Sequence, residues 1–203
     1  MKRLVQIGLA AALTSTACMP AAMAQQAVTA APAAAAAVAA PALAATPAAI
    51  PAARPADVAS IDAIVAALYQ VISGPAGAPR DWDRMRSLFA PDARMGAIAM
   101  RPDGSTPLRT MSPEDYIARN TKAFATMGFF ETELARTTET FGQLAHVFST
   151  YEARHAANDA KPFMRGINSI QLVHDGKRWY VLSLVWRAED AKLQLPERYL
   201  RNG

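Results

Sequence analysis

Cysteine is almost absent from this 203-residue sequence, which contains a single one, Cys18. One thiol cannot close an intramolecular disulfide, nor can it supply the several thiolates of a cysteine-ligated metal site. If Cys18 is removed with the N-terminal segment described next, the mature chain lacks thiol chemistry as well. The folded part must then be stabilised by its own hydrophobic core.

The apolar run nearest the N-terminus, residues 4–13, is too short for a membrane span, which needs roughly 20 residues. It follows Lys2 and Arg3 and precedes the small residues Ala-Met-Ala at 22–24. This order is typical of a secretory signal peptide, with cleavage after residue 24. We therefore expect an exported, periplasmic or extracellular protein without a transmembrane segment. Lipid anchoring at Cys18 is a weaker alternative, because the residues before it lack the usual branched apolar side chain.

Charge is scarce in residues 25–56, where Arg54 is the only charged residue among alanines and prolines. Five prolines in this stretch would interrupt any helix that the alanines favour. We predict a disordered linker here, followed by one domain over residues 57–203.

A basic surface for nucleic acid is also missing. Three of the 21 Lys and Arg residues precede residue 57, which leaves 18 against 17 Asp and Glu, or a net charge of about +1 for the domain. These charges are spread evenly, without a basic stripe, so nucleic-acid binding has no support. Neither a Gly-x-Ser-x-Gly nucleophile motif nor a phosphate-binding glycine loop occurs.

What the domain does contain is helical periodicity first and strand-like stretches afterwards. Apolar spacing, capping residues and turn residues predict a helix over residues 57–73, a short helix that starts at Asp81 and ends before Pro91, and a helix over 112–128. They also predict a strand, turn and short return strand over 94–110, and strands over 129–141, 143–155, 163–174 and 177–188. This order indicates an α+β fold with helices on one face of a curved antiparallel sheet.

Two stretches carry a resemblance to a known family: "DWDRMRSLFAPDA" at 81–93 and "INSIQLVHDGKRWYVLSLVW" at 167–186. They resemble the nuclear transport factor 2-like superfamily, and within it the SnoaL-like branch. The resemblance implies a cone-shaped fold in which three N-terminal helices pack on a curved antiparallel sheet and enclose a pocket. Members of this superfamily include isomerases, dehydratases, cyclases and many proteins with no known catalysis, and homodimers are common among them.

The ketosteroid isomerases of that superfamily allow a comparison residue by residue. Their general base falls here on Ala97, their buried protonated acid on Asn168, and their tyrosine near Ala67. Alanine cannot transfer a proton, whereas an amide can still donate a hydrogen bond. The resemblance therefore predicts a pocket for a small apolar molecule, without that isomerase chemistry and without a cofactor.

Strand alternation predicts which side chains line this pocket. With Asn168 directed inward, Tyr151, Tyr180 and Trp186 on neighbouring strands are expected to point inward too. Asn168 is then either a ligand donor or a structural amide satisfied by its neighbours, as most buried polar groups are. We favour the structural amide, with Tyr151 as its partner.

Other polar residues give less support for chemistry. His146 and His155 should face opposite sides of one strand, and His174 should lie in a turn, so a zinc site is not expected. Asp81 and Asp83 stand at a helix start, where acids usually cap the helix or favour its dipole. A paired-carboxylate acid–base site is the alternative for these two residues.

The outward face of the sheet is predicted to be unusually apolar, with Phe148, Ile167, Val181, Ser183 and Val185. Such a surface favours a homodimer through the sheet, unless the C-terminal residues 191–203 cover it.

Three functions remain open from the sequence. They are a pocket that binds a small apolar molecule, an enzyme of the cyclase, isomerase or dehydratase type, and a dimeric interaction module. For the enzyme, Tyr151 or the Asp81 and Asp83 pair would supply the chemistry. The question that separates the first two is whether any carboxylate or histidine side chain enters the cavity.

Overall fold

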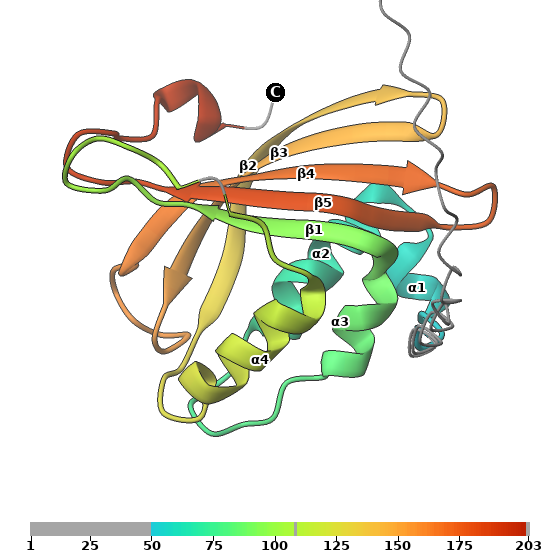
Figure 1. Cartoon of the computed structure of the whole chain (residues 1–203), viewed down its shortest axis with the longest axis horizontal. Helices are drawn as coiled ribbons and strands as arrows, with labels where there is room; N and C mark the ends of the chain where they lie inside the picture. The colour runs from blue at the N-terminus through green and yellow to red at the C-terminus, as the bar shows by residue number, and fades with distance from the viewer. Residues whose placement is uncertain (1–49, 108, 202–203) are drawn as a thin grey trace, which may run out of the picture. The chain divides into compact units, whose positions relative to one another are not determined.

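The computed structural model describes residues 50–107 and 109–201 (Figure 1). The predicted signal peptide, Cys18 and most of the predicted linker lie outside the described residues. Within them, the helices are α1 (Pro55–Val58), α2 (Ile61–Ile72), α3 (Trp82–Leu88) and α4 (Pro113–Phe124), with a short 3-10 helix η1 (Glu197–Tyr199) near the C-terminus.

A single sheet forms the other layer of the domain. The described strands are β1 (Phe89–Ile98), β2 (Phe130–Phe141), β3 (Leu144–Arg154), β4 (Met164–His174) and β5 (Trp179–Ala188), in the spatial order β1-β5-β4-β3-β2. Helices α2, α3 and α4 all lie on one side of this sheet (Figure 1). The predicted α+β architecture, with helices on one face of the sheet, is therefore confirmed. Its antiparallel pairing holds for β2 to β5, whereas β1 pairs with β5 in parallel.

The helix starts follow local capping rules. The Ser60 hydroxyl accepts a hydrogen bond from the Ala63 amide, which begins α2 and divides the helix predicted over 57–73 into α1 and α2. Ser112 and Asp115 form a capping box at the start of α4. Asp81 caps α3, as predicted, by accepting from the Arg84 amide at 2.9 Å.

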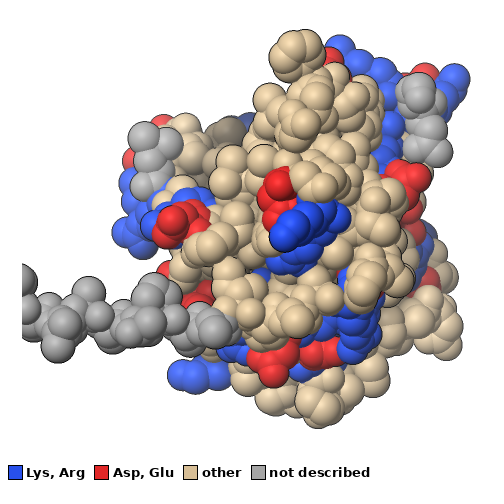
Figure 2. Space-filling view, turned by 90° about the vertical axis from the view of Figure 1, so that its right-hand side faces the viewer, with Lys and Arg blue, Asp and Glu red and all other residues tan. Residues whose placement is uncertain are grey.

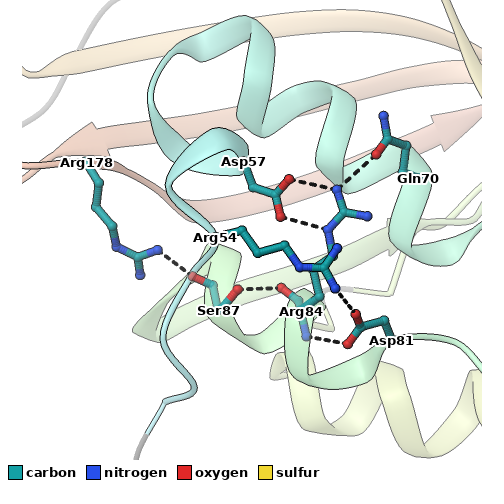
Figure 3. A network of polar contacts seen from close by, with 7 residues as sticks. All are labelled: Arg54, Asp57, Gln70, Asp81, Arg84, Ser87 and Arg178. Carbon is teal, nitrogen blue, oxygen red and sulfur yellow. Dashed lines mark hydrogen bonds and ion pairs between the residues drawn. The ribbon is translucent and has the colours of Figure 1, made fainter.

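The domain begins upstream of the predicted boundary at residue 57. Arg54 pairs with Asp81 at 2.7 Å, and Asp57 receives a two-pronged hydrogen bond from Arg84 at 2.7 and 2.8 Å (Figure 3). Hydrogen bonding to Arg84 lowers the pKa of Asp57, which keeps this carboxylate ionised. These contacts fix α1 against α3 and make the end of the predicted linker part of the fold.

A second polar cluster closes the end of α2. The buried guanidinium of Arg80 donates to four backbone carbonyls, those of Ile72 (2.9 Å), Gly74 (2.6 Å), Pro75 (3.2 Å) and Ala78 (2.8 Å). A cation at this position suits the negative end of the helix and satisfies carbonyls that have no partner within it. Arg80 therefore acts as a structural residue.

The described residues between 105 and 110 do not form the predicted return strand. A turn over 102–104 is present, with the Gly104 amide bonded to the Arg101 carbonyl at 2.9 Å. After it, the chain makes only an isolated bridge between Met95 and Met111. Pro107 has no amide hydrogen to give to a neighbouring strand, which explains why pairing stops there.

A bulge changes which side chains of β5 face the helices. Leu172 pairs with Val181 while Gln171 pairs with Ser183, so Leu182 is an extra residue. Val181, predicted to face outward, is fully buried, whereas Leu182 is 46% exposed. The inward direction predicted for Tyr180 is wrong for the same reason. Its ring instead lies under the Arg178 guanidinium, 3.7 Å from the ring centroid.

The C-terminal segment covers part of the outer face of the sheet, on the side opposite the helices (Figure 1). The Tyr199 ring contacts Phe148 with centroids 5.2 Å apart, and the Thr150 hydroxyl donates to the Tyr199 carbonyl at 2.5 Å. This cover lies over β3, while Leu182 on β5 keeps nearly half of its surface exposed. The C-terminal residues therefore cover part of this face, and the homodimer stays a prediction.

Charged side chains of both signs are interspersed on the face shown in Figure 2. Across the described residues, no helix has both the length and the apolar character needed to cross a membrane.

Candidate functional site

The inner face of the sheet and helices α2 and α4 enclose a cavity of about 320 Å³. This volume suits a small ligand. Most of the lining is aliphatic, aromatic or methionine side chains, with a few polar groups among them. The polar or charged residues of the lining are Tyr69, Tyr116, Arg119, Asn120, Glu131, Tyr151 and Asn168. The arrangement is that of an apolar pocket with a small set of orienting groups.

A carboxylate does enter this cavity: that of Glu131, the second residue of β2. Glu131 lines the cavity and is partly buried. Burial raises its pKa to about 7, although a hydrogen bond from the Asn168 amide nitrogen (3.1 Å) opposes that rise. Glu131 is therefore close to half ionised at neutral pH.

A chain of hydrogen bonds leads away from Asn168. Its amide nitrogen also donates to the Tyr69 hydroxyl at 3.2 Å, and Tyr69 and Ser149 share a hydrogen bond of 2.6 Å. The Ser149 hydroxyl donates to the Glu133 carboxylate at 2.5 Å. Since Ser149 gives its proton to Glu133, Tyr69 must donate to Ser149, and every direction in the chain is fixed.

These contacts identify Asn168 as a structural amide. Its nitrogen serves two partners, Tyr69 and Glu131, so the amide hydrogens are already used inside the protein. The preference for a structural role agrees with this geometry. The predicted partner, Tyr151, is wrong, because the Asn168 amide turns toward α2 and β2 instead.

Tyr151 presents the opposite case. Its side chain is 1% exposed and lines the cavity, yet its hydroxyl has no hydrogen-bond partner among the described residues. A buried hydroxyl without a partner costs free energy, which a ligand can recover. Gly166 lies opposite Tyr151 in the β3–β4 ladder, and a Cβ there would come within 2.8 Å of this hydroxyl.

The tyrosines remain protonated and are coupled to Glu131. Burial raises the pKa of Tyr151 and of Tyr116 above their usual value, and the Glu131 carboxylate raises both further. Burial likewise raises the pKa of Tyr69. Tyr116 and Tyr151 are therefore hydrogen-bond donors within electrostatic reach of a carboxylate that titrates near neutrality.

The other predicted pocket residues separate into two groups. Ala97 and Trp186 line the cavity, and Trp186 contacts the edge of the Tyr116 ring with centroids 6.1 Å apart. Tyr180 does not line it and borders a shallow surface depression beside residues 50–53. Tyr69, two residues beyond the Ala67 position suggested by the resemblance, is the tyrosine of α2 that reaches Asn168.

Sequence reasoning missed Glu131, although it had asked whether a carboxylate enters the cavity. The stretch "ETE" at 131–133 is typical of a strand exposed to solvent, because two acids flank a threonine. Tyr116 was likewise hidden within an amphipathic helix, α4. Only the proximity of these residues to Asn168 and Tyr151 reveals a site, and no local pattern encodes that proximity.

The remaining polar candidates lie away from the cavity. Asp81 and Asp83 are paired with Arg54 and Arg86 respectively. His146 contacts Ser169, His155 stacks on Phe163 beyond the end of β3, and His174 contacts Trp179. In the part of the chain that the structure describes, no three histidine or acidic side chains are grouped so that they could hold a metal ion.

Comparison with known proteins gives distant structural matches only. No family model and no curated protein matches the sequence. Among solved structures, a protein of unknown function with a cystatin-like fold from Nostoc punctiforme is 11% identical, with a TM-score of 0.49 over 64% of this chain and 90% of that one. An NTF-2 like protein of unknown function from Silicibacter pomeroyi is 20% identical, with a TM-score of 0.43 over 64% and 94%.

A candidate scytalone dehydratase from Novosphingobium aromaticivorans is 16% identical, with a TM-score of 0.38 over 51% of this chain and 68% of that one. Identities this low concern the fold and leave the activity open. The narrower SnoaL-like resemblance stays a prediction. The chain itself has helices on one face of a curved, mostly antiparallel sheet that encloses a cavity.

Proposed function

We propose that the domain binds a small, largely apolar molecule in its cavity and that Glu131 transfers a proton to or from it. The observation that carries this proposal is a carboxylate with a pKa of about 7 inside an apolar cavity. A group whose pKa lies near the working pH is well matched to general acid–base catalysis. This function corresponds to the isomerase or dehydratase type of activity, with Glu131 in place of the missing base at Ala97.

Glu131 and Tyr151 have complementary roles in the proposed proton transfer. Ionised Glu131 takes a proton from a carbon next to a carbonyl group of the ligand, and the electron pair of the broken C–H bond moves onto the carbonyl oxygen. The free hydroxyl of Tyr151 donates a hydrogen bond to that oxygen as its charge develops. Because the pKa of Tyr151 is raised, this hydroxyl acts as a donor without losing its proton. Protonated Glu131 then returns the proton.

Exchange of α-hydrogens tests this proposal without knowledge of the natural substrate. Cyclohexanone in D₂O serves as the probe, and NMR follows the loss of its α-proton signals. We expect the protein to accelerate exchange and the rate to rise with pH through about 7, as Glu131 becomes ionised. Glu131→Gln should abolish the acceleration, whereas Glu139→Gln, an exposed acid on the same strand, should leave it unchanged.

Two outcomes would contradict the proposal in different ways. Equal acceleration by the wild-type protein and Glu131→Gln would remove Glu131 from the chemistry. Probe binding without any acceleration would leave a binding domain, the first function considered from the sequence.

We further propose that two copies of the exported domain associate through the uncovered part of the outer sheet face. Export rests on the N-terminal sequence, and association on the exposed Leu182. Light scattering should give twice the monomer mass, and Leu182→Lys should halve it. A monomeric wild-type protein would overturn the association.

A further inference from the structure

Arg119 is the single cationic side chain that lines the cavity within the described residues. It lies on α4, three residues after Tyr116, and is exposed to solvent. It forms no hydrogen bond or ion pair with another described residue, and its charge helps to lower the pKa of Asp115, one helical turn earlier. The cavity thus has an uncommitted positive charge at its solvent-facing rim.

This charge does not neutralise Glu131. The pKa of Glu131 is set by burial and by the hydrogen bond from Asn168, and Arg119 has no resolved effect on it. Glu131 is partly buried and Arg119 is exposed, so the carboxylate lies deeper in this cavity than the guanidinium. Apolar side chains such as Met111, Trp186 and Ile72 occupy the same lining.

We infer that the ligand is a small carboxylic acid, with its carboxylate at Arg119 and its apolar body in the cavity. This inference rests on the proposed function and names its substrate class. A guanidinium matches the fork of a carboxylate, and binding at the rim keeps the two negative charges apart. A single cation suits a monoanion, whereas a phosphate dianion would call for further donors. The reacting oxygen of the ligand then lies toward Tyr151.

A matched pair of probes tests the substrate class. Calorimetry on the full chain compares 3-phenylpropanoate with 3-phenylpropanamide, which has nearly the same shape without the charge. We expect the wild-type protein to prefer the acid by about ten-fold, in the range of one charge-assisted hydrogen-bonded contact. Arg119→Gln should remove this preference by weakening acid binding and leaving amide binding unchanged.

The control is Arg109→Gln, which removes the same charge from an exposed position outside the cavity lining. It should keep the preference for the acid. Equal loss in the Arg109 and Arg119 variants would overturn the inference in favour of a general positive field. Equal binding of both probes by the wild-type protein would overturn it and leave the proposed pocket standing. If neither probe bound, both the inference about Arg119 and the proposed pocket function would be overturned.

Discussion

Two buried polar clusters stand within one small domain, and they differ in how completely they are satisfied. Around Arg80, four carbonyls accept from one guanidinium, so each of its three nitrogens has a partner within the protein. Around Glu131, the Asn168 amide is used, but the Tyr151 hydroxyl has no partner and the carboxylate is desolvated. A complete network stabilises the fold, whereas an incomplete one lining a cavity indicates where a ligand binds.

The largest expected effect comes from breaking the complete cluster. Arg80→Met keeps most of the unbranched stem of the side chain and removes four hydrogen bonds, so the free energy of unfolding should fall by on the order of 4 kcal/mol, at about 1 kcal/mol per bond. Urea unfolding measures this loss, with the exposed Arg101→Met as control. A loss no greater than that of the control would show that Arg80 is not a structural residue.

The carboxylate of the incomplete cluster should make stability depend on pH. The pKa of Glu131 rises from 4.5 in the unfolded chain to about 7 in the folded one. Its contribution is thus fully present below pH 4.5 and is lost as the pH rises toward 7, because the unfolded chain releases the proton first. Glu131→Gln should be more stable than the wild-type protein at pH 8, by up to roughly 3 kcal/mol, with little difference at pH 4. If the free energy of unfolding of the two proteins differed by the same amount at every pH, the raised pKa of Glu131 would be contradicted.

The next largest effect on stability is expected at Asn168, whose amide nitrogen donates to both Tyr69 and Glu131. Asn168→Leu strands both partners and should cost ~1–3 kcal/mol of stability. The same change removes the hydrogen bond that favours the ionised carboxylate, so the pKa of Glu131 should rise further. Thermal unfolding and NMR titration measure the two effects. An unchanged melting temperature of Asn168→Leu would contradict the structural role and favour Asn168 as a hydrogen-bond donor to a ligand.

The smallest effect on stability should come from the hydroxyl without a partner. Tyr151→Phe removes no hydrogen bond and relieves a buried hydroxyl without a partner, so the free energy of unfolding should not fall and should rise slightly, by about 0.5 kcal/mol. Tyr69→Phe is the matched variant in the same cavity. It breaks the bonds to Ser149 and Asn168 and should cost about 1–2 kcal/mol. Equal costs for the two tyrosines would erase the distinction between satisfied and unsatisfied groups.

The fold was accessible from the sequence because its signals are local. Apolar spacing and the caps at Asp81 and Ser112 predict the helices, and alternation predicts the long strands. The bulge that exposes Leu182 and displaces Tyr180 was not accessible, since it depends on the register between β4 and β5. Pro107, by contrast, is a local signal against the return strand. The prediction gave more weight to the turn at residues 102–104.

The site was only partly accessible. Ala97, Tyr151, Asn168 and Trp186 follow from strand direction and the resemblance, and all four line the cavity. Glu131 does not, because its role arises from burial by residues distant in the sequence. An acid at a strand edge and an acid in a cavity have the same local pattern, and only tertiary packing separates their pKa values.

Direct titration of Glu131 tests the central claim, that this carboxylate is held near neutral pKa for proton transfer. The ¹³C signal of its carboxyl carbon, assigned by its disappearance in Glu131→Gln, can be followed from pH 3 to 9. The account predicts a midpoint at about 7. A midpoint near 4.5, the ordinary value of a glutamate, would contradict it.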